Sequence, residues 1–213
     1  MRVPIHSQGW PFIGLAIALN AALLAWLGWW GLAMLPVTLW VLAFFRDPER
    51  HPPEGAGLIV SPADGVLLPV ASAMPPSELA LAPLPRTRLS IFMNVFDIHV
   101  NRIPEGGVVE GLAYRPGKFF NASFDKASEH NERMAVRLRL VGGAELIVVQ
   151  IAGLVARRIF CALTEKQQVR RGQRFGLIRF GSRLDVYLPE GARVLVQHGQ
   201  RVRAGETVLA ALN

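Results

Sequence analysis

Residues 135–151 read Ala-Val-Arg-Leu-Arg-Leu-Val-Gly-Gly-Ala-Glu-Leu-Ile-Val-Val-Gln-Ile, and this stretch decides the fold class. Apolar and charged residues alternate over 135–140. This is the pattern of a half-exposed β-strand, because successive side chains of a strand point to opposite faces. Gly142 and Gly143 come next, and paired glycines favour the tight turn of a β-hairpin. The apolar run over 145–151 then predicts a second strand.

Short runs rich in valine, isoleucine and leucine recur after residue 55, separated by glycine, proline and polar clusters. No segment there keeps a 3.6-residue period over three turns, and no long repeat occurs. We therefore expect a mostly β (α+β) fold, with a compact β-sandwich or barrel-sandwich-like domain. The remaining runs cover 57–60, 66–70, 88–92, 108–113, 184–187 and 193–196.

The last part of the chain shows a further β pattern. In residues 191–211, valines are spaced by turn glycines at Gly199 and Gly205. This spacing resembles the tight turns of lipoyl-like and hybrid barrel-sandwich domains. The lysine that would carry a lipoyl group is missing, so the resemblance concerns the fold and not carrier chemistry.

The first 45 residues differ from the rest, because Arg2 is their only charged residue. The uncharged run from Trp10 to Phe45 is long for one membrane helix, which needs about 20 residues, and short for two. Two glycines and two tryptophans over 28–31 favour a turn near its middle. We expect two short helices over about 11–27 and 31–45, arranged as a hairpin or a re-entrant pair, with a kink at Pro36.

A cleaved signal peptide is the alternative interpretation of this segment. The apolar run is much longer than the roughly 7–15 residues of a signal-peptide core, and no small-residue cleavage site closes it. We expect residues 1–45 to be a membrane anchor and 46–213 to form one further domain. A hairpin places Arg2 and Arg46 on the same side of the membrane. The positive-inside rule makes that side cytoplasmic, at the cell (inner) membrane.

The net charge of +7 points to an anionic partner. Beside a membrane anchor, the favoured partner is an anionic lipid surface. Nucleic acid is the competing interpretation, but the positive charges are scattered and no nucleic-acid-binding motif occurs. The single cysteine, Cys161, excludes an internal disulfide framework and a cysteine-based zinc site.

Three clusters carry polar residues in patterns that packing alone does not require: residues 61–65, 94–104 and 176–185. Asp64 precedes a glycine, which is also the pattern of an ordinary β-turn. His99 lies among apolar neighbours, where a buried structural histidine is the alternative. Ser182 is not part of a Gly-x-Ser-x-Gly elbow, because Leu184 takes the place of the last glycine, and this disfavours hydrolases of that class.

Taken together, seven segments form an ordered set from about residue 44 to 190. They are Phe44–Arg50, Ser61–Gly65, Asp97–His99, Gly117–Ala122, Asp125–Ser128, Asn131–Arg133 and Phe180–Arg183. This set resembles the phosphatidylserine decarboxylase family, in its short bacterial branch. Any one segment alone would be unspecific, whereas their order is specific.

The resemblance implies a proenzyme that cuts itself between Gly181 and Ser182. The products would be a β chain, 1–181, and an α chain, 182–213, which remain associated. Ser182 would become a pyruvoyl group, the covalent cofactor. Its carbonyl would form a Schiff base with the serine amine of phosphatidylserine, and loss of CO₂ would give phosphatidylethanolamine. No metal is implied.

The same resemblance assigns roles to individual residues. His99 is the expected general acid/base, and Asp64 is expected to orient it. His130 is a weaker candidate for the base, and Asp97 is a weaker alternative to Asp64. Longer family members carry a second histidine three residues after the first, where this chain has Arg102. The base for self-cleavage is therefore left open.

Basic residues of the segment 117–133 suit a phosphodiester or a carboxylate. Lys118, Lys126 and Arg133 are the expected substrate-binding residues, and an ordinary charged loop is the alternative. Two rival functions also stay open. One is decarboxylation of another serine-headed lipid such as archaetidylserine, and the other is a non-catalytic, membrane-tethered barrel-sandwich adaptor.

Overall fold

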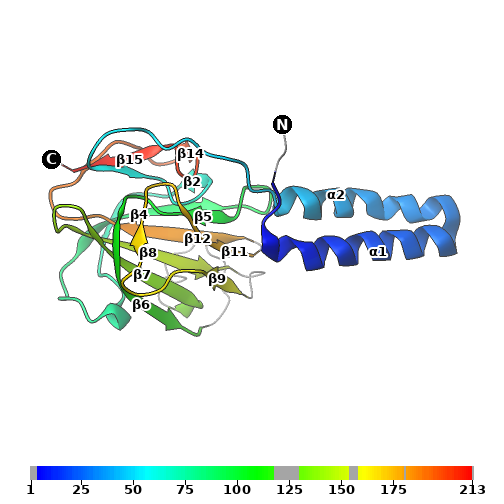
Figure 1. Ribbon diagram of the computed structural model, residues 1–213, viewed down its shortest axis with the longest axis horizontal. Coiled ribbons are helices and arrows are strands. Elements are labelled where there is room, and N and C mark those ends of the chain that lie inside the picture. The colour runs from blue at the N-terminus through cyan, green and yellow to red at the C-terminus, as the bar shows by residue number, and fades with distance from the viewer. Residues whose placement is uncertain (1–3, 118–129, 154–157, 180, 213) are drawn as a thin grey trace. The chain divides into compact units, whose positions relative to one another are not determined.

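The computed structural model describes residues 4–117, 130–153, 158–179 and 181–212. The chain divides into two compact units, of which the first ends at Glu49 and the second starts at Arg50. The first unit is helical and the second is built of strands (Figure 1). The prediction of a mostly β chain with an N-terminal apolar helical segment is confirmed.

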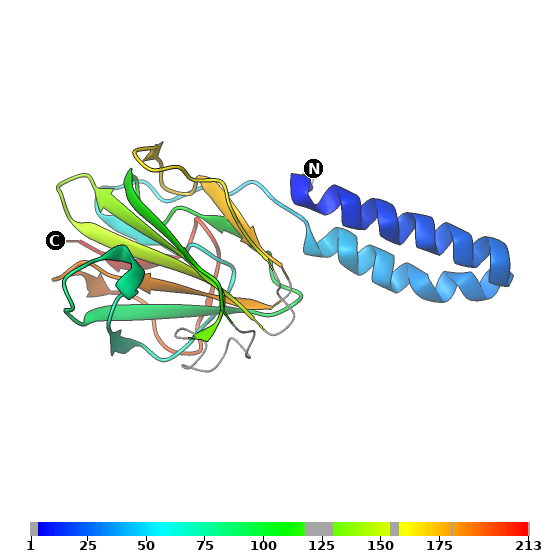
Figure 2. The same cartoon turned by 90° about the horizontal axis from the view of Figure 1, so that it is seen from below.

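The first unit is a helical hairpin, whose two helices lie side by side in Figures 1 and 2. The Thr38 hydroxyl of the second helix lies 3.5 Å from the Ala16 carbonyl of the first. Ile5 forms an antiparallel bridge with Arg46, so the chain enters and leaves the hairpin at the same end. The elements are η1 (Ser7–Gly9), α1 (Trp10–Leu27), η2 (Gly28–Met34) and α2 (Leu35–Phe44).

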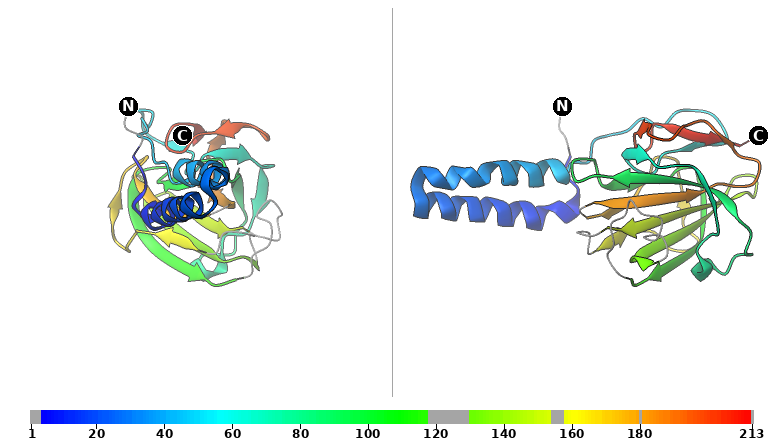
Figure 3. Two further views of the ribbon diagram at one scale, coloured as in Figure 1. Left: turned by 90° about the vertical axis from the view of Figure 1, so that its right-hand side faces the viewer. Right: turned by 180° about the vertical axis from the view of Figure 1, so that it is seen from behind.

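Two glycines form the turn of the hairpin. Gly28 has a φ of 57°, in the left-handed region that favours glycine. Gly31 lies so close to the first helix that a Cβ there would be 2.4 Å from the backbone nitrogen of Leu24. The predicted turn over 28–31 is thus confirmed, and Figure 3 shows the two helices end-on as separate coils.

The second helix differs from its prediction. Residues 28–34 form a 3₁₀-helix, so α2 begins at Leu35 and not at residue 31. Pro36 falls in the first turn of α2, where its missing N–H would have no helical partner in any case. The predicted kink at Pro36 is therefore wrong, because this proline starts the helix. The predicted first helix, 11–27, is confirmed to within one residue.

The helical segment Ser7–Phe44 is long and apolar enough to cross a membrane, judged by its 38 residues and its composition. Most of its large apolar side chains are exposed. The three most exposed lie at or near the turn, where Trp26, Trp29 and Trp30 are each more than 80% exposed.

The second unit consists of antiparallel strands in three sheets. The longest strands belong to one nine-stranded sheet. Its path runs β10-β6-β7-β8-β12-β4-β2-β14, and β3 pairs with β4 beside this path. Its strands are β2 (Gly65–Leu67), β3 (Ala71–Ala73), β4 (Arg86–Met93), β6 (Gly107–Arg115), β7 (Arg133–Leu140), β8 (Glu145–Ala152), β10 (Gln168–Val169), β12 (Ser182–Tyr187) and β14 (Arg201–Val202).

Two three-stranded sheets complete the unit. One has the order β1-β15-β13 and the other β5-β11-β9. A short 3₁₀-helix, η3 (Ser77–Leu79), follows β3. The strands of these sheets are β1 (Leu58–Val60), β5 (Val100–Arg102), β9 (Ile159–Cys161), β11 (Arg174–Ile178), β13 (Arg193–Val194) and β15 (Val208–Ala211).

The hairpin predicted from residues 135–151 is confirmed. β7 and β8 pair antiparallel, with Val136 opposite Val148. Gly142 and Gly143 have φ values of 95° and 88°, which only glycine adopts at low cost. Val136 and Leu138 point into the larger of two apolar clusters, while Arg139 faces solvent.

The larger apolar cluster fills one face of the nine-stranded sheet, and a smaller one lies on the opposite face. Leu184 and Val186 of β12 belong to the larger cluster, whereas Tyr187 belongs to the smaller. This division follows from the strand period of two. β12 lies between β8 and β4, so both of its edges are paired.

Candidate functional site

Ser182 is the first residue of β12 and is completely buried. It pairs with Met93 of β4 on one side and with Ala152 of β8 on the other. Its hydroxyl Oγ lies 4.0 Å from the sulfur of Met93. The sheet therefore fixes the backbone at Ser182 from both sides.

Gly181 precedes the strand with a φ of 69°. Among the described residues that are not adjacent in the chain, the one neighbour of a Cβ at this position within 4 Å would be a methyl carbon of Val95, at 4.0 Å. The requirement for glycine here is conformational and not steric, since other residues adopt this φ only at a cost.

His99 is brought directly to this glycine. The Gly181 N–H donates to Nε2 of His99 at 3.3 Å, and Nδ1 of the ring lies 2.9 Å from the Asp97 carbonyl oxygen. A carbonyl can only accept, so Nδ1 carries the proton and donates it, while Nε2 is the acceptor. The imidazole is thus in the neutral tautomer whose Nε2 lone pair accepts the hydrogen bond from the Gly181 N–H.

The loop that carries His99 is held by the Asp97 side chain. Its carboxylate accepts from the Asn94 N–H at 2.9 Å and from Arg201 at 2.6 Å. The imidazole is fully buried, so its orientation is set by these backbone and loop contacts. The backbone carbonyl of Asp97, and not its carboxylate, makes the hydrogen bond to His99.

Asp64 has different partners. Its carboxylate accepts from Arg50 at 2.8 Å and from the Ala204 N–H at 2.7 Å. Burial raises the pKa of Asp64 above its ordinary value, although the Ala204 amide and Arg50 act in the opposite direction. The negative charge of Asp97 also raises the pKa of Asp64, because the two carboxylates are close enough to repel each other. The predicted orienting role of Asp64 stays a prediction.

Arg102, at the position of the second histidine in longer family members, is buried and donates to the Gly172 carbonyl at 3.0 Å. Arg133 donates to Glu78 through Nε at 3.0 Å and also through Nη2. Lys118 and Lys126 lie outside the described residues. Of the three predicted substrate-binding residues, the structure therefore places only Arg133.

A buried polar cluster that was not predicted from the sequence lies beside Ser182. Asn101 Nδ2 lies 3.9 Å from the same Met93 sulfur that Ser182 contacts. Gln150 donates to the Asn101 side-chain oxygen at 2.8 Å. The only signal for it was the presence of Asn101 and Gln150 within otherwise apolar strand patterns.

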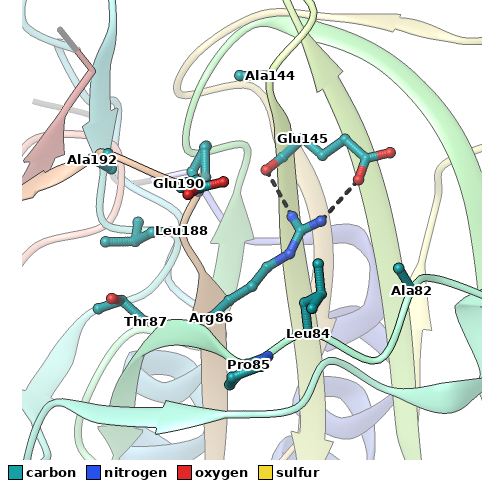
Figure 4. A pocket seen from close by; sticks show the side chains of 12 residues that line it. Ala82, Leu84, Pro85, Arg86, Thr87, Ala144, Glu145, Leu188, Glu190 and Ala192 are labelled. Atoms are coloured by element: carbon teal, nitrogen blue, oxygen red, sulfur yellow. Dashed lines mark hydrogen bonds and ion pairs between the residues drawn. The ribbon is translucent and has the colours of Figure 1, made fainter.

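One clear hollow of the second unit lies away from this site. It is lined by residues 82, 84–87, 144–145 and 188–192. Arg86 crosses it to pair with Glu145 at 2.9 Å (Figure 4). Leu188 follows the last residue of β12, whereas Ser182 is its first. The hollow is thus at the other end of the central strand from His99.

Comparison with known proteins identifies the family of the chain. The sequence model of the phosphatidylserine decarboxylase family matches residues 37–210. The chain belongs to this family. The resemblance noted from the seven ordered segments is confirmed.

Several family members are similar to the chain over nearly its whole length, and each is named a phosphatidylserine decarboxylase proenzyme. That of Paramagnetospirillum magneticum is 57% identical over 99% of this chain and 88% of its own. That of Cereibacter sphaeroides is 55% identical over 98% and 90%. That of Ruegeria pomeroyi is 53% identical over 98% and 95%. Family membership supports a decarboxylase made as a precursor.

Proposed function

We propose that the chain is a proenzyme that cuts itself between Gly181 and Ser182, and then decarboxylates phosphatidylserine to phosphatidylethanolamine. The observation that carries this proposal is the hydrogen bond from the Gly181 N–H to His99 Nε2. It puts a neutral imidazole, whose Nε2 accepts a hydrogen bond from Gly181, beside the residue that forms the bond to be cut.

Self-cleavage needs only groups of this chain and water. Ser182 Oγ attacks the Gly181 carbonyl carbon, the C–N bond breaks, and the hydroxyl proton passes to the Ser182 amine, which gives an ester. Removal of the Ser182 α-proton expels the Gly181 carboxylate and leaves dehydroalanine. Water then releases ammonia and leaves a ketone at the new chain end. His99 is the base that we assign to these proton transfers.

The residues present fit the group formed in this way. Gly181, on the acyl side of the bond, adopts a positive φ that residues with a Cβ adopt only at a cost. Ser182 is fixed because β12 is paired on both of its edges. The pyruvoyl group supplies an electron sink for the charge left when CO₂ departs. Once the site accepts substrate, the buried His99 can hold or return a proton there.

We further propose that the first unit anchors the enzyme in the cell membrane with the second unit on the cytoplasmic side. The 18 residues of α1 span about 27 Å, close to the roughly 30 Å of a bilayer's hydrocarbon core. Trp10 lies at one end of this helix, and Trp26, Trp29 and Trp30 lie at the other. Tryptophans favour both interfaces of a bilayer, so the length of α1 and the positions of these tryptophans support a membrane-spanning hairpin.

The substrate partner is then a phospholipid presented at the surface on which the enzyme sits. The net charge of +7 supports attraction to an anionic lipid surface, and no nucleic-acid partner is proposed. Lys118 and Lys126 remain the proposed headgroup-binding residues from the sequence analysis.

The test is the intact mass of purified protein, combined with a decarboxylation assay on phosphatidylserine vesicles. We expect two chains that join at residues 181 and 182, with the small chain lighter than its serine form by one ammonia in total. The carbonyl oxygen that comes from water replaces the serine hydroxyl oxygen, so the number of oxygen atoms in the small chain is unchanged. Ser182→Ala should stay uncut and inactive, while Ser90→Ala, at another buried serine of the same sheet, should mature. An uncut, active wild-type chain would refute the proposal.

A further inference from the structure

Three completely buried polar side chains meet beside the proposed cut: Ser182, Asn101 and Gln150. The Ser182 hydroxyl and the Asn101 Nδ2 both have the Met93 sulfur as their acceptor, at 4.0 and 3.9 Å. A thioether sulfur is a weak acceptor. The Gln150 Oε1 is buried and has no hydrogen-bond partner among the described residues. Buried polar atoms nearly always have good partners, so these three atoms need an explanation other than stability.

The orientation of both amides follows from one backbone carbonyl. Gln150 Nε2 lies 3.4 Å from the Phe160 carbonyl oxygen, which can only accept. The same nitrogen donates to the side-chain oxygen of Asn101 at 2.8 Å. Asn101 therefore presents its oxygen to Gln150 and its nitrogen, Nδ2, to Met93. The cluster thus directs an N–H donor, and not an acceptor, toward the sulfur that Ser182 contacts.

The fold makes room for the amide that holds Asn101. Gly176 of β11 pairs with Asn101 of β5, and a Cβ at this glycine would lie 2.7 Å from Gln150 Nε2. Gln150 lies directly opposite Leu184, two residues beyond Ser182 on β12. The side chains of Gln150 and Ser182 are therefore on the same face of the large sheet.

The segment around β5 brings both the base and the amide donor to this face. His99 immediately precedes β5 and Asn101 is its middle residue, so the two are alternate residues of an extended chain and point the same way. His99 accepts from the Gly181 N–H, and Asn101 contacts the sulfur beside Ser182. The two side chains thus approach the two residues that flank the proposed cut.

The proposed cut creates a need for such a donor. When Ser182 Oγ attacks the Gly181 carbonyl carbon, an O–C bond forms and an electron pair of the carbonyl moves to its oxygen. This oxygen is then two bonds from Oγ and is negatively charged, until the C–N bond breaks and the carbonyl forms again. A fixed N–H donor stabilises an oxyanion strongly in a buried site. Met93 is unbranched and adaptable, so its sulfur can give up Nδ2 to this stronger acceptor.

We propose that Asn101 is a further catalytic residue of self-cleavage, whose Nδ2 donates to the oxyanion formed at Gly181. Gln150 is a positioning residue, which acts through the Asn101 side-chain oxygen. The inference rests on the proposed cut between Gly181 and Ser182. Asn101 stabilises charge in this step, whereas His99 transfers protons.

The test follows maturation of the full chain, made by cell-free synthesis in detergent micelles, by intact mass over time. Asn101→Leu removes the donor and keeps a buried side chain of similar size. We expect the uncut chain to disappear about 10²- to 10³-fold more slowly, which is the effect of losing one oxyanion donor. Val136→Ala removes two methyl groups from the apolar cluster on the same face, and this matched control should mature at the wild-type rate.

Hydroxylamine added during maturation shows which step is slowed, because it cleaves esters far faster than peptide bonds. It would convert the ester into a large chain that ends in a hydroxamate and a small chain that keeps Ser182 as serine. We expect this pair from wild type and much less of it from Asn101→Leu. Formation of the ester by Asn101→Leu at the wild-type rate would overturn the proposal.

A conservative variant separates a donor from a residue that only supports the fold. Asn101→Asp introduces a carboxyl group, which can donate when protonated and cannot when ionised. We expect it to mature faster than Asn101→Leu, with the larger advantage at acid pH. Equal rates of the two variants at every pH from 8 to 5.5 would overturn the proposal.

Gln150→Leu tests the positioning role and gives a second readout if Asn101→Leu does not fold. Asn101 keeps its donor in this variant but loses its anchor, so we expect slower maturation than in Val136→Ala. Maturation of both variants at the same rate would contradict the role of Gln150. A wild-type chain that stays uncut would refute the proposed function itself. A wild-type chain that is cut, together with Asn101→Leu cut at the rate of Val136→Ala, would overturn this inference alone.

Discussion

At the residue scale, the proposed chemistry depends on one buried imidazole whose tautomer is fixed by a backbone carbonyl. The Asp97 oxygen on Nδ1 leaves Nε2 as an acceptor toward Gly181. A serine-hydrolase triad achieves the same tautomer with a carboxylate. Here the backbone oxygen of Asp97 does so.

His99→Ala removes the proposed base and the acceptor of the Gly181 N–H. We expect self-cleavage to slow by about 10²- to 10⁴-fold, the range for loss of a general base. The time course of chain cleavage after expression, followed by intact mass, measures this. His198→Ala, at an exposed histidine of the small chain, is the control, and equal slowing in both variants would contradict the role of His99.

Asp64→Asn tests the orienting role that the sequence analysis gave to this carboxylate. We expect slower self-cleavage, because the negative charge near the His99 loop is lost while the shape is kept. Glu206→Gln is the matched control, since Glu206 is the other carboxylate bound by Arg50. Cleavage at the same rate in Asp64→Asn and wild type would remove Asp64 from the mechanism.

Glu78 makes the free energy of unfolding depend on pH. Burial acts to raise its pKa, but its own backbone N–H and the guanidinium groups of Arg133 and Arg115 lower the pKa overall. A lowered carboxyl pKa stabilises the fold above the ordinary value of 4.5, and this contribution is lost as pH falls.

We therefore expect Glu78→Gln to melt at a lower temperature than wild type at pH 7, with a difference that shrinks below pH 4.5. Thermal melting of the full chain between pH 7 and pH 3.5 measures this. A difference that grows toward acid would show that the sign is wrong.

At the scale of elements, the strands with a clear apolar period were the ones that the sequence could predict. The hairpin over 135–151 and the strand at 88–92 were predictable, because apolar and polar residues alternate in 135–140 and 88–91, which is the period of a half-buried strand. β5 was not predictable, because its three residues, Val100–Arg102, show no such pattern. Its polar side chains are buried, and they bind groups that are distant in the sequence.

The candidate site was predictable to a similar degree. The family pattern indicated Gly181, Ser182 and His99, and the structure brings these three together. The partners of His99 and Asp64 could not be predicted, because they are backbone groups and an arginine that only the fold places. The residue types of a motif do not reveal which carbonyl will lie beside an imidazole.

The buried pair of Gln150 and Asn101 should couple β8 to β5. Gln150→Leu leaves the Asn101 side-chain oxygen without the donor that the structure gives it, which costs about 1–3 kcal/mol of the free energy of unfolding. Adding Asn101→Leu should recover part of this loss. A double-mutant cycle by urea unfolding measures the coupling, and additive costs would show that the pair is not coupled.

At the scale of the whole molecule, the proposed cut does not divide the fold. β12 of the small chain would lie between β4 and β8, which both belong to the large chain. β14 and β15 of the small chain pair with β2 and β1 of the large chain.

We therefore expect the two chains to co-purify and to separate only in denaturant. Size-exclusion chromatography of matured protein, with and without urea, measures this. The uncut Ser182→Ala chain marks the elution position of the intact unit. Loss of the small chain under native conditions would contradict the proposed cleavage site.

Burial of Ser182 in the middle of a sheet has a further consequence for how the cell obtains this enzyme. The groups that would cut the chain come from residues 99 and 181–182, more than 80 positions apart, and meet only after the long-range strands have paired. A misfolded copy does not bring His99 to the Gly181–Ser182 bond and therefore would not be cut. Maturation would then act as quality control, in which every active molecule has already passed a test of its three-dimensional structure.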